Sequence, residues 1–527
     1  MPRRTPDHQI GTHSSDFAKG FPMHGVVTNS EFQSCIQREF PAVRNKAYLD
    51  SACIGVAPFR AVRAVTDLAQ GMQYCIGESG TEMHGRLNVT RAAAHPMAAR
   101  LIGAEPSDIA LVESATQGLK IAAEALPLKA GDHVLVPDLE FVQMGLMWRQ
   151  MEARGVTVRA VPHAQGRISV DAVRAQLTPE VKVLAISSVQ WTNGFRVDLA
   201  SISELCRQRE IWLVVDAAQH LGSLALNVKE TPVDILVCGG HKWLCSPFGS
   251  GFMYLSPKAR PQLRRPLAGF FSAKPPARTW GEAFLRTDIT PFQEYEFTGD
   301  ASAWETGGTG NYPGAVGLAA SLSVIHELRP QRIQEHIHAL ADYLLEGLDR
   351  LGIETVSPRA VEDRSGIVTF RAGNAAADQT VLRTLLAAGV AVSMRYISGV
   401  GGIRVSCHHY NTLAHIDQLL EAVEKWQHRP TRPRPARAEA EGSDARLLPP
   451  LVTRQRALID ALDDDLMGLI TARNSVARGI RLGRLAGALP RTDLAREREV
   501  IERFHQRLGQ DGTRLALELL RTTKGNT

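Results

Sequence analysis

Long apolar runs and paired cysteines are both missing from this sequence of 527 residues. No run approaches the roughly 18 apolar residues of a membrane-spanning helix, and residues 1–20 lack the hydrophobic centre of a secretory signal. The seven cysteines are scattered, without a Cys-x-x-Cys pair, which disfavours a disulfide framework and a zinc site. No internal repeat is visible. We therefore predict a cytoplasmic protein with reduced thiols, no metal site and no membrane partner.

A strong excess of charge of one sign is also missing. The formal net charge is only +5, and the excess lies in residues 427–527, which carry 19 Lys and Arg against 13 Asp and Glu. Because acidic and basic residues are interleaved there, the excess does not indicate a nucleic-acid partner. An apolar content of 44% and a charged content of 22% are typical of a soluble globular protein. The length predicts two or three domains.

Two short apolar runs in the middle of the chain are typical of buried strands in a parallel sheet, Trp212–Val215 and Ile235–Val237. Asp216 follows the first run directly, and His241 and Lys242 lie just past the second, before a glycine-rich hairpin. Open α/β sheets bind ligands at the carboxyl ends of their strands. Taken alone, these residues are equally typical of an ordinary strand end and an exposed lysine. Matches elsewhere in the chain favour a ligand site.

The stretch 214–254 resembles the cofactor-binding region of the class V aminotransferase family, which includes cysteine desulfurases and isopenicillin N epimerase-like proteins. The resemblance implies an α/β protein with the type I fold of pyridoxal 5′-phosphate (PLP) enzymes, a large, mostly parallel sheet followed by a smaller α/β part. Lys242 would carry the cofactor through a desolvated amine, and Asp216 would keep the pyridine nitrogen protonated. Gln219 would bond the ring's phenolic oxygen, and His241 would reach the phosphate or the substrate.

A phosphate-binding turn is predicted at Ser114, Ala115 and Thr116, where an apolar strand meets an amphipathic helix. Backbone N–H groups and the helix dipole at such a turn favour an anion, and Thr116 adds a hydroxyl. The family has a similar turn. A plain helix cap formed by Ser114 is the alternative interpretation.

Several positions depart from the family's pattern. Phe141 stands where the family usually has a histidine stacked on the cofactor ring, so it could stack but could not relay a proton. Gln190 and Trp191 occupy positions near the ring. Gly239 replaces a hydroxyl residue that often binds the phosphate. The resemblance assigns part of that role to Thr309, which would reach the phosphate of a partner subunit and implies a homodimer.

The stretch 392–412 resembles the family's element for binding the substrate's carboxylate. Arg404 would hold the α-carboxylate of an amino acid through two hydrogen bonds, and Arg395 would line the same mouth. Desulfurases carry a nucleophilic cysteine before this arginine, but Arg395–Ile403 contains none, which disfavours their persulfide chemistry. The adjacent His408–His409 are expected on opposite faces of a strand, so no metal site is predicted there.

The chain is predicted to divide into four parts. A flexible segment spans 1–36, a class V PLP domain spans 37–426 with its smaller subdomain at about 315–426, a Pro- and Arg-rich linker spans 427–450, and a helical part spans 451–527. In the last part, apolar residues at helical spacing predict a long helix and then two shorter ones.

The helical part resembles the all-helical chorismate mutase family. Chorismate is a dicarboxylate, so such a site needs arginines for both carboxylates and a cation near the ether oxygen. The resemblance implies six candidate residues: Arg456, Arg473, Arg484, Asp493, Arg496 and Glu497. A late glutamine of that family has no counterpart here. An active mutase, an isochorismate-lyase or binding role, and a module that only dimerises all stay open.

The predicted function is a PLP-dependent class V aminotransferase that acts on an amino acid in a chorismate-linked pathway, with a fused chorismate mutase-like part. A carbon–sulfur lyase or desulfurase is the alternative, because elimination and transamination would share Lys242, Asp216 and Arg404. A catalytically silent PLP-fold scaffold carrying a helical module is a third possibility.

Overall fold

The computed structural model describes most of the first 428 residues and part of the C-terminal segment. The described residues are 26, 30–44, 46–74, 78–428, 466, 470, 473, 474, 477 and 494–524. The chain divides into two compact units, Met1–Pro430 and Thr431–Thr527.

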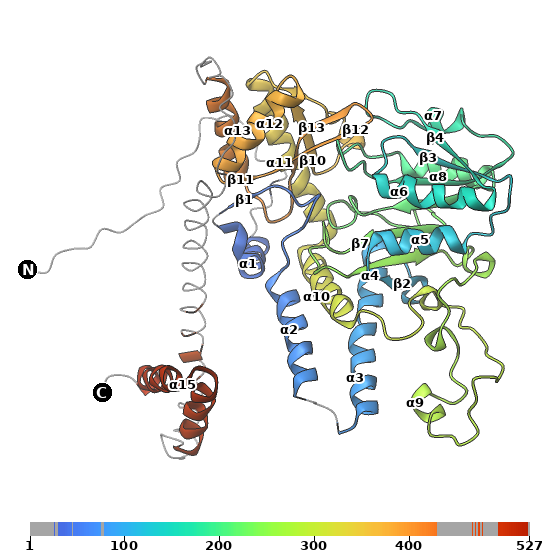
Figure 1. Cartoon of the computed structure of the whole chain (residues 1–527). Helices are drawn as coiled ribbons and strands as arrows, with labels where there is room; N and C mark the ends of the chain where they lie inside the picture. Colours follow the sequence, from blue (N-terminus) through green and yellow to red (C-terminus); the bar gives the residue numbers. More distant parts are fainter. Residues whose placement is uncertain are drawn as a thin grey trace, which may run out of the picture. The chain divides into compact units, whose positions relative to one another are not determined.

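A seven-stranded sheet forms the centre of the first unit (Figure 1). In spatial order its strands are β2 (Ile109–Val112), β8 (Gly251–Leu255), β7 (Ile235–Gly239), β6 (Trp212–Asp216), β5 (Val181–Ser187), β3 (His133–Pro137) and β4 (Thr157–Val161). Strand β8 is antiparallel to both of its neighbours, and the other neighbouring pairs are parallel. The predicted mixed, mostly parallel sheet is confirmed.

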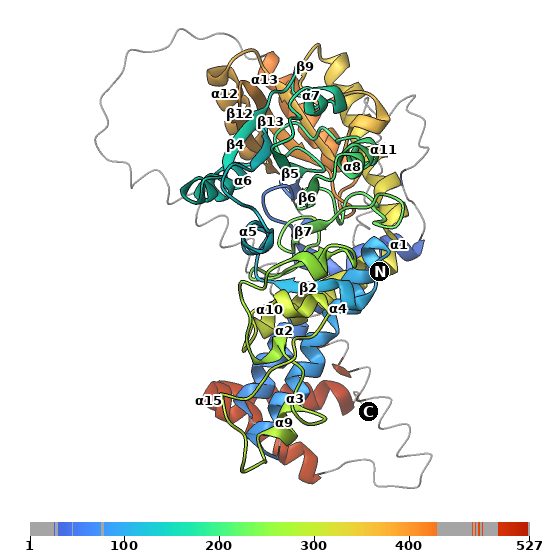
Figure 2. The same ribbon diagram turned by 90° about the vertical axis from the view of Figure 1, so that its right-hand side faces the viewer.

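Helices cover both faces of this sheet, which is why most residues of its central strands are buried. The α-helices of the described residues are α1 (Ser30–Glu39), α2 (Phe59–Gln73), α3 (Gly80–Ala92), α4 (Ala94–Ile102), α5 (Ala115–Ala125), α6 (Val142–Arg149), α7 (Val170–Arg174), α8 (Leu199–Gln208), α9 (Trp280–Ala283), α10 (Tyr312–Leu328), α11 (Pro330–Arg350), α12 (Ala375–Ala387), α13 (Leu413–Gln427) and α15 (Leu494–Lys524). Figure 2 shows α5 and α6 on one side of the strands and α8 on the other.

Alternating side chains of each strand reach the two layers. Val214 belongs to a core with residues of α5 and α6, and Val215 to a second core with residues of α4, α8 and α10. The apolar run at 212–215 thus supplies both cores, and the polar residue Asp216 stands at the carboxyl end of β6.

A smaller sheet follows in the chain. Its four antiparallel strands, in spatial order, are β12 (Ser393–Ile397), β13 (Val400–Ser406), β10 (Ile367–Arg371) and β9 (Glu354–Thr355). Beside it, β1 (Ala47–Tyr48) pairs in parallel with β11 (Val390–Ala391). Helices α11, α12 and α13 contribute to its core. The β1–β11 pair ties the start of this unit to its C-terminal part.

The N-terminal prediction is wrong in part. Residues 30–36 fall within the predicted flexible segment, but they belong to α1, where Phe32, Cys35 and Ile36 are buried. These three residues recur at helical spacing and form an apolar stripe that packs into the core. Most of residues 1–29 and most of the predicted linker 427–450 lie outside the described residues.

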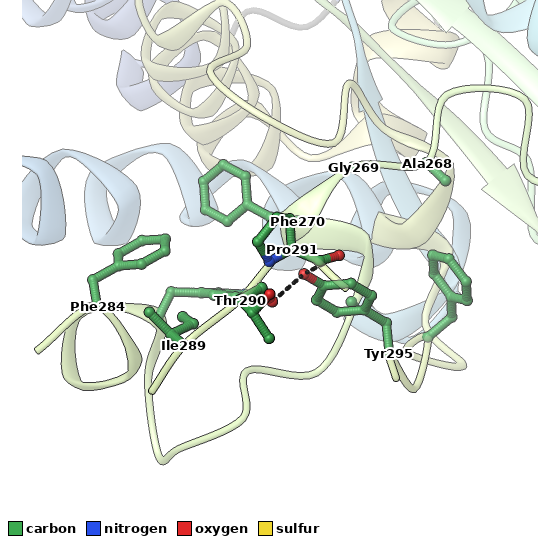
Figure 3. Close-up of a pocket in the computed structure, with 11 residues that line it drawn as sticks. Ala268, Gly269, Phe270, Phe284, Ile289, Thr290, Pro291 and Tyr295 are labelled. Atoms are coloured by element: carbon green, nitrogen blue, oxygen red, sulfur yellow. Dashed lines mark hydrogen bonds between the residues drawn. The ribbon is translucent and has the colours of Figure 1, made fainter. Parts of the chain in front are cut away.

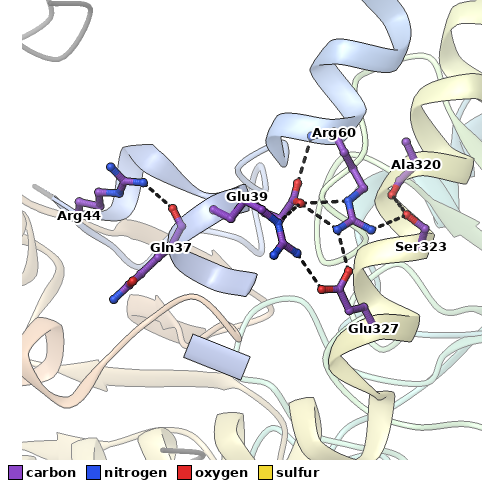
Figure 4. A network of polar contacts seen from close by, with 8 residues as sticks. Gln37, Glu39, Arg44, Arg60, Ala320, Ser323 and Glu327 are labelled. Carbon is purple, nitrogen blue, oxygen red and sulfur yellow. Dashed lines mark hydrogen bonds and ion pairs between the residues drawn. The ribbon is translucent and has the colours of Figure 1, made fainter. Parts of the chain in front are cut away.

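A polar network holds α1 against α2 and α10 (Figure 4). The buried carboxylate of Glu39 accepts hydrogen bonds from Arg60 and Arg38, and both arginines also bond Glu327. Burial alone would raise the pKa of Glu39, but these bonds lower it overall. The network is therefore a structural clamp, with each buried charge paired.

Residues 91–101 have the apolar spacing of a helix despite Pro96. In the structure this stretch is shared by the end of α3 and by α4, which meet at Ala93. Pro96 then lies in the first turn of α4, where its missing N–H costs no intrahelical bond.

In the second unit, α15 is interrupted at Gly509, whose φ of 63° lies outside the helical region. The two helices that meet there correspond to the two shorter helices expected from the sequence. Most of the longer helix predicted before them lies outside the described residues. Within the described part of the chain, no helix is long and apolar enough to cross a bilayer.

Candidate active site

A cavity of about 360 Å³ lies at the carboxyl ends of the central parallel strands. It is lined by Ala52, Cys53, Ser114, Ala115, Thr116, Leu119, Phe141, Gln143, Met144, Ser187, Trp191, Asp216, Ala218, Gln219, His241, Lys242, Arg395 and Arg404. Most of the predicted cofactor and substrate residues therefore share one cavity, although they come from distant parts of the chain. Gln190 and Thr309 are not among its lining residues.

Asp216 and Lys242, two side chains of opposite charge, line the same cavity. Asp216 is the last residue of β6, and its Oδ1 accepts a 2.8 Å hydrogen bond from Ala218 N–H. Burial raises the pKa of Asp216, and the positive charge of Lys242 partly offsets this rise. Burial lowers the pKa of Lys242, and the negative charge of Asp216 partly offsets this fall. A lysine of lowered pKa has a larger fraction of neutral, nucleophilic amine.

A glycine lets the chain's first loop lie against this lysine. Gly55 N–H donates to His241 O at 2.8 Å, and a Cβ at position 55 would lie 1.9 Å from Lys242 O. This close approach brings the loop carrying Cys53 to the cavity. No local pattern in the sequence indicates this contact, because the loop and Lys242 are far apart in the chain.

The N-terminus of α5 is the cavity's anion-binding end. Ser114 Oγ accepts a hydrogen bond from Gln117 N–H at 3.1 Å, so Ser114 forms the helix cap that the sequence also allowed. The N–H groups of the first turn have no partner within the helix, and Thr116 adds its hydroxyl to the lining. A Cβ at Gly239 would lie 3.4 Å from Ala115 N. The glycine therefore keeps the space beside this helix end open, and a phosphate fits there.

Phe141 faces Lys242 across the cavity. The centroid of its ring lies 5.9 Å from Lys242 Nζ, and its ring forms a T-shaped pair with Trp191, with centroids 5.2 Å apart. A flat aromatic face is available to a cofactor ring, and it carries no exchangeable proton.

Gln190 is turned away from the predicted position. Its Nε2 donates to the buried Glu140 at 3.1 Å. Glu140 also accepts from the backbone and hydroxyl of Ser187, the ladder partner of Asp216. Three donors converge on one carboxylate, and this draws Gln190 out of the cavity. Burial nevertheless raises the pKa of Glu140 to about 7.

Two predicted cofactor residues already have partners. Gln219 Nε2 donates to Ala52 O at 3.0 Å, and its Oε1 accepts from Trp243 Nε1–H at 2.6 Å. Its second amide hydrogen is the one available to a ligand. The His241 ring stacks on Phe248 with centroids 5.1 Å apart, and burial, with the charge of Lys242, lowers its pKa to about 4. His241 is therefore neutral near pH 7.

Arg404 lies almost fully buried on β13. Its Nη1 donates to Trp191 O at 2.9 Å, its Nη2 lies 3.3 Å from Asp50 Oδ1, and among the described residues its buried Nε has no partner. Arg395 lines the same cavity, where its Nη2 lies 3.8 Å from Cys53 Sγ. An unsatisfied donor on a buried guanidinium suits an incoming carboxylate.

Thr309 is exposed, in the loop that precedes α10. The loop is anchored by the buried Glu305, which pairs with Arg91 and accepts from Leu111 N–H at 2.8 Å, while His95 Nε2 lies 2.6 Å from its Oε1. The anchor fixes the loop but does not bring Thr309 to the cavity of its own chain.

The adjacent histidines are not on a strand, because β13 ends at Ser406. The expectation of opposite faces is therefore wrong, and the ring nitrogens of His408 and His409 lie with Cys245 Sγ within 4.8 Å of one another. His408 Nδ1 accepts from His409 N–H at 2.8 Å, and its Nε2 lies 3.1 Å from Trp243 O. Both nitrogens of His408 are thus engaged within the protein.

A larger cavity, of about 510 Å³, shares no lining residue with the first. Figure 3 shows its aromatic wall, with Tyr295 Oη donating to Thr290 O at 3.5 Å and Pro291 O at 3.4 Å. Phe270 and Phe284 add apolar surface. It has no lining carboxylate, lysine, arginine or histidine, so we place the chemistry in the smaller cavity.

Of the six candidates in the helical part, Arg456, Arg484 and Asp493 lie outside the described residues. Arg473 Nη1 donates to Leu519 O of α15 at 3.2 Å. Arg496 pairs with Glu499, and Glu497 lies in the first turn of α15.

The sequence profile of the aminotransferase class-V family matches residues 47–419. The chain belongs to the class V aminotransferase family. Among class V relatives, a probable cysteine desulfurase of Methanothermobacter thermautotrophicus is 25% identical over 405 residues, covering 74% of this chain and 97% of that protein. Isopenicillin N epimerase of Streptomyces clavuligerus is 29% identical over 339 residues, covering 62% and 82%.

Solved structures have a similar fold. The apo cysteine desulfurase of Thermococcus onnurineus NA1 superposes with a TM-score of 0.65 at 22% identity, covering 74% of this chain and 97% of that one. The cystine C–S lyase C-DES, in complex with its product cysteine persulfide, superposes with a TM-score of 0.63 at 24% identity, covering 73% and 98%. The family match ends before the helical part 451–527.

Proposed function

We propose that this class V protein is a PLP-dependent enzyme that breaks a carbon–sulfur bond of an amino acid. The observation that carries the proposal is the placement of Lys242, Asp216 and Arg404 in one cavity beside the N-terminus of α5. The names of the relatives add support for the bond that is broken, since one is a probable cysteine desulfurase and a protein of similar fold is a cystine C–S lyase.

The cavity fits PLP on its donor set. Lys242 would hold the cofactor's aldehyde carbon, Asp216 its pyridine nitrogen, and the first turn of α5 with Thr116 its phosphate. The ring would lie against Phe141. Bound PLP supplies an electron sink for the charge that develops at the substrate's Cα.

The protein's own groups divide the remaining work. Arg404 binds the α-carboxylate and so orients the Cα–H bond. The amine of Lys242, when free, is the base that takes the proton from Cα, because burial lowers its pKa. Phe141 shields the amine from water on its side and handles no proton. His241, neutral near pH 7, donates or accepts a hydrogen bond without adding charge.

The sulfur-containing group then leaves from Cβ. Residues 395–403 hold no thiol to take it, so we propose that it departs as a small molecule rather than on that loop. The predicted aminotransferase activity is the competing function, since it needs the same three residues.

Product analysis separates these functions. The PLP-loaded protein is incubated with cysteine, cystine, alanine and glutamate singly, and the products are identified by mass spectrometry. Pyruvate with released sulfur supports the lyase, whereas alanine with sulfur on the protein indicates a desulfurase. A keto acid that keeps its side chain, together with an aminated cofactor, would establish an aminotransferase and reject the proposal.

We also propose a homodimer in which Thr309 serves the partner's phosphate, since Thr309 is exposed and lies outside its own cavity. Sedimentation would give the assembly, and Thr309→Ala would weaken PLP binding while Thr290→Ala would not. Unchanged PLP affinity in Thr309→Ala would reject the shared site.

A chorismate mutase-like function for residues 451–527 stays a prediction. Its test is direct: the full-length protein either consumes chorismate or does not.

A further inference from the structure

The cavity lining has more cationic than anionic side chains. Its lining contains Lys242, Arg395 and Arg404 but a single carboxylate, Asp216. The negative charge of Asp216 acts on Lys242, and Asp50 Oδ1 lies 3.3 Å from Arg404 Nη2. Among the described residues, Arg395 has no carboxylate within ion-pair distance. It is the cation of this cavity that neither the protein nor the proposed reaction uses.

The β-ladder places Arg395 next to Arg404. Ser393 pairs with Arg404 and Arg395 with Gly402 across β12 and β13, so the two arginines are diagonal neighbours on one face of the sheet. Burial lowers the pKa of Arg404 and the charge of Asp50 raises it. The positive charge of Arg395 is the next largest influence and lowers it further. Two guanidinium groups held this close favour a ligand with two anionic groups, because each anion relieves their repulsion.

The protein's contacts leave Arg395 open. Its Nη1 donates to Met394 O at 2.9 Å, and its Nη2 meets only the soft Sγ of Cys53 at 3.8 Å. An oxyanion is a stronger acceptor than a thiol sulfur. The cofactor's phosphate has its own place at α5, on the large sheet, and the α-carboxylate has Arg404.

We propose that Arg395 recognises a second anionic group, so that the substrate is an amino acid whose side chain ends in a carboxylate or a sulfur oxyanion. The inference rests on the proposed function, because it takes Arg404 as the site of the α-carboxylate. It narrows the substrate class from any cysteine-like amino acid to a dianionic one.

Two unreactive probes test this without turnover. Succinate and butyrate have the same number of carbons, and only succinate has a second carboxylate. Calorimetric titration of the PLP-loaded protein is expected to give succinate a dissociation constant roughly 10- to 100-fold lower than that of butyrate. Arg395→Gln removes the preference and Arg395→Lys retains part of it. Arg383→Gln is the matched control, because Arg383 lies on α12 and is not a lining residue of the cavity.

Three outcomes would overturn the inference: equal affinities in the native protein, a preference that survives in Arg395→Gln, or loss of PLP affinity in that variant, which would assign Arg395 to the phosphate. Circular dichroism and the melting temperature establish that each variant is folded. Failure of the C–S lyase proposal shows separately, as missing sulfur release from a protein that still prefers succinate.

Discussion

The ring centroid of Phe141 lies 5.9 Å from Nζ of Lys242, so the lysine assigned to the cofactor faces a side chain that cannot exchange a proton. We predict that Phe141→His adds an ionisation near the usual histidine pKa of about 6.5 to the pH profile of kcat, because a titratable ring then faces the reacting atoms. Phe141→Leu is the control and adds none. An unchanged profile in Phe141→His would mean that position 141 does not meet the substrate.

Lys242 is predicted to be the point of covalent attachment. After borohydride treatment of the PLP-loaded protein, the mass of PLP should remain on the peptide that contains Lys242, and Lys242→Ala should retain none and lose at least about a hundredfold in turnover. Lys258→Ala, at an exposed lysine, should behave like the native protein. Retention of the cofactor's mass by Lys242→Ala would refute the assignment.

Cys53 is predicted to be the first of the described cysteines to react with a thiol reagent. Cys35, Cys206 and Cys407 are buried, which raises each thiol pKa to about 12, and burial also raises those of Cys238 and Cys245. Cys53 is only partly buried and meets a guanidinium.

Brief treatment with N-ethylmaleimide, followed by peptide mass spectrometry in a Cys75→Ser background, measures the order of reaction. We expect turnover to fall as Cys53 is labelled and succinate to slow the labelling. Faster labelling of a buried cysteine would contradict the described packing.

His220 is predicted to make stability depend on pH. Burial, with the charge of Arg196, lowers its pKa from 6.5 to about 4. Between pH 6.5 and 4 the histidine is protonated in the unfolded chain but stays neutral in the folded chain. The free energy of unfolding therefore falls as the pH drops through this range, by up to about 3 kcal/mol. Denaturant titrations should show a shallower fall for His220→Gln than for the exposed-site control His428→Gln. Parallel curves for the two variants would contradict the buried neutral state.

The sequence by itself determined the features that depend on neighbouring residues. The apolar runs at 212–215 and 235–237 correspond to the central strands β6 and β7. Asp216 follows the first run directly, Lys242 lies a few residues past the second, and both line the cavity at the carboxyl ends of these strands. The turn at Ser114 was predictable for the same reason, since a helix cap is set within four residues. Alternation and capping are local, and so they are visible in the chain.

Only the tertiary structure decided what distant segments do to one another. Cys53 reaches the cavity because Gly55 lets its loop lie on Lys242, and Gln190 leaves it because Glu140 attracts its amide. Arg395 and Arg404 become neighbours through the register of β12 and β13. Such contacts depend on the packing of segments that are far apart in sequence, and no local pattern encodes which polar group will find which partner.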